Sequence, residues 1–174
     1  MIKTIFKYFH RPIFQLPAFL CPIGSLKNNE ALNLSKSVKF KPNCAYNLNN
    51  AKQRDWNKLF GVCFGIVGIH KTSVRFGWRY REDLDLIELC VIIYRENQKP
   101  IRETVAYLNI DFEYNLEISI LRKDNSYKVY FKTFGVDVYN IILDCNSSHY
   151  YGCGFYFGGK SRAPHKMFID IKNN

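Results

Sequence analysis

The chain has 174 residues, of which 47% are hydrophobic and 16% aromatic, and its formal net charge is +10. This length suits a single domain, and the many Phe and Tyr residues favour β-structure, because their side chains fit a pleated, half-buried surface. No stretch approaches the roughly 18 consecutive apolar residues of a transmembrane helix, which excludes a helical membrane span.

Residues 1–36 are predicted to form an irregular, basic arm in front of a domain that covers residues 37–174. The first 52 residues hold eight Lys or Arg against one acid, Glu30. Prolines at 12, 17 and 22 each remove a backbone donor, and apolar residues lie between them. We expect self-association through this arm. Its charge also suits nucleic acid or another anionic partner, whereas a solubilising leader is the simpler alternative.

The start of the chain resembles a signal peptide in part, since an apolar stretch from Ile13 to Ile23 follows early lysines. The prolines interrupt that stretch, however, and His10 and Arg11 lie directly before it. No cleavage site of two small residues follows closely. We therefore expect an unprocessed, cytoplasmic chain.

Residues 37–42 alternate between apolar and polar side chains, which is typical of a half-buried strand. One short helix is predicted after it, capped by Asn49 or Asn50, because three apolar residues fall on one helical face. These residues are Trp56, Leu59 and Phe60. The glycines at 61, 65 and 68 then predict a close-packed loop.

The clearest strand covers residues 72–80, where apolar side chains alternate with Ser73, Arg75, Gly77 and Arg79. It is predicted to form a hairpin with residues 86–96. Further strands are predicted at 101–108, 114–121, 127–134, 136–143, 149–159 and 165–172. About nine or ten strands joined by short turns predict an all-β protein, either an antiparallel β-sandwich of jelly-roll type or a barrel.

Two stretches, residues 70–80 and 155–165, resemble small uncharacterised bacterial or phage-borne proteins. Phe157-Gly158-Gly159, followed by a final alternating strand, is also similar to the ending of laminin-G-like and concanavalin-like jelly rolls. The resemblance covers about residues 55–172 and implies a jelly roll, with a phage gene as one expected source. The sugar-binding and calcium-binding motifs of those lectins are not found here, nor are the paired carboxylates of the related glycosidases.

Six cysteines stand at positions 21, 44, 63, 90, 145 and 153, with no CxxC pair among them. Buried free cysteines commonly serve as small hydrophobic residues, so free thiols are predicted. Cys145 and Cys153 flank His149 at equal spacing, but no second ligand pair of ordinary zinc spacing supports a metal site. No metal and no other cofactor is predicted.

A candidate ligand site combines the polar face of the strand at 72–80 with a basic turn near residue 160. Its predicted members are His70, Ser73, Arg75, Arg79, Lys160, Arg162 and His165. The two arginines of the strand stand about 13 Å apart, so they could frame an anion or a sugar, with Gly77 leaving a gap between them. The alternative is a solvated face, where both arginines pair with acids on neighbouring strands. Those acids are Glu88, Glu103, Glu113 and Glu117.

The leading interpretation is a non-catalytic binding module that holds a carbohydrate or a small anionic ligand on a sandwich face or its loops. A structural or interaction protein, such as a virion or assembly component attached by the basic arm, is one alternative. A hydrolase or lyase on a jelly-roll scaffold is another. An enzyme is less favoured, and no catalytic residue is assigned, because no nucleophile, base and orienting group stand together in the sequence.

Overall fold

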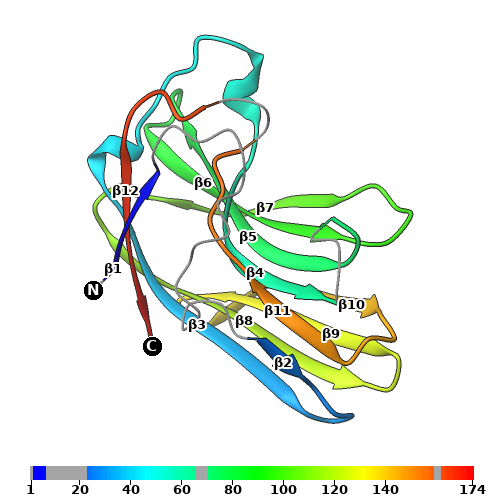
Figure 1. Ribbon diagram of the computed structural model, residues 1–174. Coiled ribbons are helices and arrows are strands. Elements are labelled where there is room, and N and C mark those ends of the chain that lie inside the picture. The colour runs from blue at the N-terminus through cyan, green and yellow to red at the C-terminus, as the bar shows by residue number, and fades with distance from the viewer. Residues whose placement is uncertain (1, 7–22, 66–69, 159–161) are drawn as a thin grey trace.

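The computed structural model describes residues 2–6, 23–65, 70–158 and 162–174, which form two six-stranded antiparallel sheets packed face to face (Figure 1). Sheet A has the strand order β1-β12-β3-β8-β9-β10, and sheet B has the order β2-β11-β4-β5-β6-β7. The predicted all-β sandwich is therefore confirmed over its barrel alternative. The described residues contain twelve strands, more than the nine or ten that the sequence suggested.

Each sheet joins a run of consecutive strands, β8 to β10 in sheet A and β4 to β7 in sheet B, to strands from distant parts of the chain. Sheet A contains β1 (Ile2–Phe6), β12 (Met167–Asn173), β3 (Ala31–Phe40), β8 (Glu113–Lys123), β9 (Ser126–Thr133) and β10 (Val136–Asp144). Sheet B contains β2 (Ile23–Ser25), β11 (His149–Cys153), β4 (Asn57–Phe64), β5 (Ser73–Arg81), β6 (Leu86–Tyr94) and β7 (Ile101–Leu108). Two short 3-10 helices, η2 (Pro42–Cys44) and η3 (Ala51–Arg54), precede β4.

Aromatic side chains from both sheets fill the core between them. Trp78 of β5 is fully buried, and its ring centroid lies 5.1 Å from that of Phe40 in sheet A. Phe76 of β5 meets Phe131 of β9 at 5.1 Å. These contacts follow from the period of two along β5, which directs every second residue into the core. The same alternation directs Ser73, Arg75 and Arg79 to the opposite face of sheet B.

The segment before β4 differs from its prediction. The Asn50 side chain accepts a hydrogen bond from the backbone N–H of Lys52, so the predicted cap exists, but η3 is a single 3-10 turn. The strand β4 replaces the rest of the predicted helix. Its register with β5 shifts between Lys58 and Gly61, which marks a β-bulge. The bulge allows the neighbouring residues Leu59 and Phe60 both to be buried. Two adjacent apolar residues of this kind also occur on the apolar face of a helix, which explains the wrong prediction.

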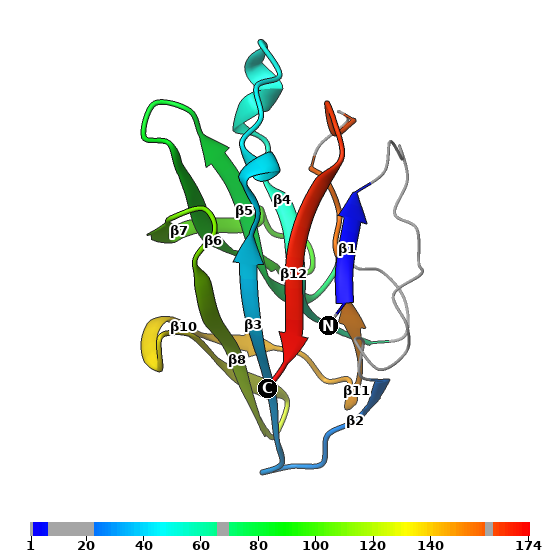
Figure 2. The same ribbon diagram turned by 90° about the vertical axis from the view of Figure 1, so that its left-hand side faces the viewer.

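The predicted irregularity of residues 1–36 is wrong for their described part. β1 pairs with β12, so the first strand lies beside the last (Figure 2). β2 pairs with β11, and β3 begins at Ala31 and continues without a break past residue 36. The prolines at 12, 17 and 22 lie outside the described residues. A separate role for residues 1–36 in association stays a prediction.

Candidate functional site

The face of sheet B that points away from the core, here called the polar face, collects side chains from β11, β4, β5 and β6. Cys63 of β4 lies opposite Tyr151 of β11 on one side and opposite Ser73 of β5 on the other. Two residues earlier on β4, Gly61 lies opposite Cys153 of β11 and Arg75 of β5 in the same way. Because directly opposed residues share a face, these side chains form one continuous layer.

The bulge in β4 adds a lysine to this layer. Lys58 pairs with Gly77, and Gly61 pairs with Arg75. Lys58 and Gly61 are three positions apart on β4, whereas their partners are only two positions apart on β5. The extra residue therefore keeps Lys58 and Gly61 on the same face. A Cβ atom on Gly61 would lie 2.4 Å from the Cβ atom of Arg75, so glycine is required for β4 to approach the arginine this closely.

Arg75 is the centre of the polar face. Its side chain is 3% exposed, it donates a hydrogen bond to Ser73 Oγ at 3.3 Å, and its guanidinium lies 5.4 Å from the centroid of the Tyr94 ring. The ring of His70 meets the same tyrosine edge-on at 5.0 Å. Tyr94 is half-buried and His70 is exposed, so these two rings lie nearer to solvent than the guanidinium does.

The charges of the polar face change the pKa values of its titratable groups. Burial lowers the pKa of Lys58 to about 8, and the positive charge of Arg75 contributes to this shift. Burial also lowers the pKa of His70, and the charges of Arg75 and Lys58 lower it further. A neutral imidazole and a partly neutral lysine can both accept a proton near neutral pH.

The opposite side of Arg75 carries a thiol and a phenol. The pKa of Cys63 is lowered, first because the Cys153 thiol donates a hydrogen bond to it, and further by the charge of Arg75 and hydrogen bonds from Tyr151 and Ser73. These effects outweigh burial. Burial and the neighbouring Cys63 raise the pKa of Tyr151. The phenol therefore keeps its proton near neutral pH and can act as a proton donor.

Arg79 has a different environment from Arg75. It donates to Glu88 at 2.7 Å, and its guanidinium lies 4.1 Å from the Trp56 ring centroid. Glu88 also accepts from Arg81 at 3.2 Å. Arg79 thus matches the alternative in which a neighbouring acid neutralises the arginine. The gap expected at Gly77 is also filled, since a Cβ atom there would lie 2.5 Å from the side chain of Ile92.

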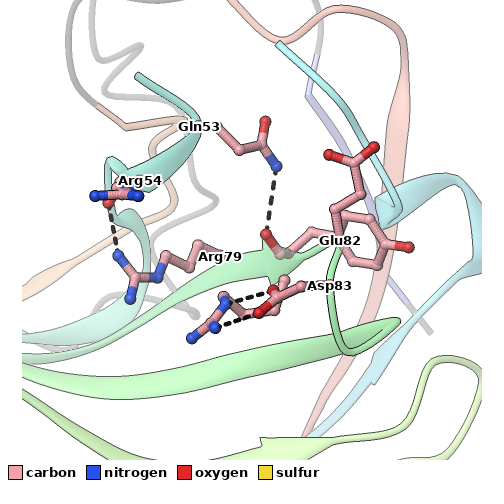
Figure 3. Close-up of a pocket in the computed structure, with 7 residues that line it drawn as sticks. Gln53, Arg54, Arg79, Glu82 and Asp83 are labelled. Atoms are coloured by element: carbon pink, nitrogen blue, oxygen red, sulfur yellow. Dashed lines mark hydrogen bonds and ion pairs between the residues drawn. The ribbon is translucent and has the colours of Figure 1, made fainter. Parts of the chain in front are cut away.

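A pocket of about 720 Å³ lies at the end of β5, between η3 and the β5–β6 turn (Figure 3). Its lining residues are Gln53, Arg54, Arg79, Tyr80, Arg81, Glu82 and Asp83. Arg81 is held by Asp83 at 2.6 Å, and Gln53 bonds to backbone carbonyls of Tyr46 and Tyr80. The polar face around Arg75 is the stronger candidate site, because its charged groups Arg75, Lys58 and Glu88 are buried.

The structure separates the remaining predicted site residues from this group. His165 bonds to the backbone carbonyl of Asn43 in η2 at 2.8 Å, beside the start of β12 in sheet A. Arg162 is exposed, and Lys160 lies outside the described residues. The ligand-binding role of all seven residues stays a prediction. Sequence reasoning missed Lys58, whose position depends on a bulge.

Two other contributors were not among the predicted site residues, because they reach Arg75 only through long-range pairing. Tyr151 and Cys63 stand 88 positions apart in the sequence, and no local pattern joins them. The five cysteines in the described part of the chain, including Cys63, are free thiols. Among the described residues, no three His, Cys, Asp or Glu side chains converge in a way that could hold a metal ion.

Solved structures share this fold, although no family model and no curated protein matches the chain. The alginate lyase AlyC3 aligns over 83% of this chain and 65% of its own, with 11% identity and a TM-score of 0.55. Its complex with dimannuronate gives 11% identity and a TM-score of 0.53, over 83% of this chain and 64% of that one. An alginate lyase from Pseudomonas aeruginosa gives a TM-score of 0.48 at 10% identity, over 82% of this chain and 64% of that one. The chain thus spans slightly less than two thirds of these enzymes.

The comparison corrects the leading interpretation of the sequence. A non-catalytic binding module is contradicted, because the solved structures that share the sandwich include the alginate lyase AlyC3. The alternative of a hydrolase or lyase on a jelly-roll scaffold is better supported. Within the described residues, no helix has the length and apolar character needed to cross a membrane.

Proposed function

We propose that this chain is a polysaccharide lyase that cleaves an acidic polysaccharide by β-elimination on the polar face of sheet B. The observation that carries the proposal is the position of Arg75, with the rings of Tyr94 and His70 on one side and Cys63 and Tyr151 on the other. The shared fold with AlyC3, which has been solved with dimannuronate, supports a uronic acid polymer as the substrate class.

β-Elimination from a uronate sugar makes three chemical demands. The carboxylate must be neutralised so that the neighbouring C5–H becomes acidic, a base must remove that proton, and an acid must protonate the oxygen that leaves C4. A C4=C5 double bond forms as the C4–O bond breaks. Preorganised donors aimed at the developing charge supply much of the catalysis in such reactions.

Three side chains of the polar face fit these demands. Arg75 can pair with the carboxylate in a fork of two hydrogen bonds, His70 can accept the C5 proton, and Tyr151 can donate to the leaving oxygen. Because Arg75 is 3% exposed, a substrate reaches it only after the half-buried rings above it move aside. Side-chain rearrangement of this kind is common on binding.

A hydrolase is the second candidate, and the carboxylates of the polar face argue against it. Glycosidases need a pair of carboxyl groups about 5–10 Å apart. Among the described residues of β4, β5, β6 and β11, the polar face has one carboxylate, Glu88, and that carboxylate is held by Arg79 and Arg81. A lyase, which needs no carboxylate pair, is therefore favoured.

The proposal is tested by following the ultraviolet absorbance of the unsaturated product with alginate, pectate and an uncharged glucan. We expect activity on one of the two polyuronates and none on the glucan. Arg75→Met should lower kcat/KM at least about 100-fold, the usual effect of removing one charge-stabilising donor. Lys39→Met, on the outer face of sheet A, serves as the matched control and should leave kcat/KM unchanged. No turnover of either polyuronate, or full activity of Arg75→Met, would contradict the proposal.

A further inference from the structure

Two cysteine thiols meet on the polar face, next to the proposed site. Cys63 of β4 and Cys153 of β11 are diagonal neighbours on paired strands, since Cys63 lies opposite Tyr151 and Cys153 lies opposite Gly61. Their side chains form a hydrogen bond to each other. Gly61 has no side chain to separate them. Both thiols are buried, at 0% and 3% exposure, and neither is part of a disulfide.

The environment of Cys63 sets it apart from three other described cysteines, Cys44, Cys90 and Cys145. Burial raises the pKa of Cys44 to about 12, and it also raises the pKa values of Cys90 and Cys145. Cys63 alone in this group has a lowered pKa, because Cys153, Arg75, Tyr151 and Ser73 stabilise its thiolate. The thiolate is the reactive form of cysteine in oxidation and in disulfide exchange.

We propose that Cys63 and Cys153 are a peroxide-oxidised thiol pair that closes to a disulfide between β4 and β11. The Cys63 thiolate attacks one oxygen of hydrogen peroxide, the O–O bond breaks, and a sulfenic acid and hydroxide result. The Cys153 sulfur then attacks the Cys63 sulfur, the S–O bond breaks, and a disulfide and water form. Peroxide is reduced by two electrons and the thiol pair is oxidised by two.

Closing the disulfide has a consequence for the polar face. Diagonal Cα atoms on paired strands lie about 7–8 Å apart, whereas bridged cysteines have Cα atoms within about 7 Å. Because β4 and β11 are already paired, oxidation therefore requires a small local shift of one strand along the other. Tyr151 lies on β11 directly opposite Cys63 and loses the thiolate that raises its pKa. The phenol of the oxidised protein should then titrate at lower pH than that of the reduced protein.

The experiment uses the full chain, reduced and then treated with hydrogen peroxide. Remaining thiols are alkylated in denaturant, and a non-reducing digest is mapped by mass spectrometry. The expected result is one dominant linked peptide pair, Cys63 with Cys153, which has lost two hydrogen atoms, while Cys44 and Cys90 stay alkylatable. A dominant link from Cys63 to any other cysteine, Cys21 included, or a fully alkylated Cys63, would overturn the proposal.

Variants separate the two chemical steps. Cys153→Ser should stop at the sulfenic acid, which dimedone traps on Cys63, whereas Cys63→Ser should leave Cys153 unmodified. Cys90→Ser is the matched control, since Cys90 is also a buried cysteine of sheet B, and it should leave the link unchanged. Where a variant fails to fold, as judged by its thermal midpoint, the wild-type map decides alone. The chemistry does not depend on lyase activity, so it stands or falls separately from the proposed function.

Discussion

The outer faces of the two sheets carry charge in different ways. On sheet A, Lys41 lies 3.1 Å from Asp170, Lys132 lies 3.7 Å from Glu117, and Lys172 lies 3.5 Å from Glu113. Most of these side chains remain about a third to a half exposed, so water solvates them and each pair contributes little. This face needs only mutual neutralisation to remain soluble.

On sheet B the charges lie out of water. Glu88, Arg75 and Lys58 are 2%, 3% and 9% exposed, and aromatic rings lie beside Arg75 and Lys58. Burying a charge is costly unless it is paired and hydrogen-bonded. Keeping the two buried cations Arg75 and Lys58 on this face lowers the stability of the fold, and this cost points to a function for sheet B. Three substitutions can test the contrast.

The largest effect is expected at Glu88, the buried acid of sheet B. It accepts hydrogen bonds from Arg79, Arg81 and Thr104. Glu88→Ala should lower the free energy of unfolding by about 2–4 kcal/mol, slightly less than for a fully buried pair, because both arginines are partly exposed. Urea denaturation measures this change. An effect no larger than that of Glu117→Ala on sheet A would show that the two faces do not differ.

The same residue predicts a dependence on pH. Burial alone would raise the pKa of Glu88, but hydrogen bonds from Arg79, Thr104 and Arg81 outweigh it and lower the pKa. Its contribution is therefore complete above the unfolded value of about 4.3 and is lost as pH falls through the lower folded value. The difference in unfolding free energy between wild type and Glu88→Ala should thus narrow below about pH 4.

A gain in stability is expected from removing the buried lysine. Below pH 8 the folded protein holds Lys58 as a buried ammonium, which the unfolded chain solvates freely. Lys58→Met should raise the free energy of unfolding by about 1–3 kcal/mol at pH 7, after allowing for the lost bond to the Trp56 carbonyl.

The sign of this effect can be checked against pH. Between pH 8 and about 10.5 the unfolded chain binds more protons than the folded protein at this position, so the wild type gains stability as pH rises. The advantage of Lys58→Met should therefore disappear by about pH 10.5. An advantage that persists there, or a loss of stability at pH 7, would mean that the lysine is not held as a buried cation.

How much the sequence could predict depends on whether the information is local. The period of two in β5 correctly placed Trp78 in the core and Arg75 on the opposite face, because alternation is a property of a single strand. The β4 bulge has no such signature, so Leu59 and Phe60 suggested a helix. β3 was placed too late in the chain because Lys36, on its core-facing side, breaks the apolar alternation expected there.

The candidate site was less accessible to sequence reasoning than the fold. Arg75 was identified from its strand, but its neighbours Cys63 and Tyr151 come from β4 and β11, which are paired only in the folded sheet. Arg79 appeared equivalent to Arg75 because it has the same residue type and faces the same way. The difference between them is made by Glu88 on β6, and only the register of the β5–β6 hairpin shows which arginine it contacts.

The smallest effect is expected on sheet A. Lys132 lies 3.7 Å from Glu117 and 3.9 Å from Asp137, and its side chain is 32% exposed. Lys132→Ala should cost about 0.2–1 kcal/mol, because an exposed pair gains little Coulomb energy and loses side-chain entropy. That small cost should fall further between low salt and 1 M salt, where the screening length drops to about 3 Å. The Glu88→Ala effect on sheet B should change much less over the same range, since buried pairs are screened weakly. Equal salt sensitivity of the two variants would contradict the contrast between a solvated face and a buried one.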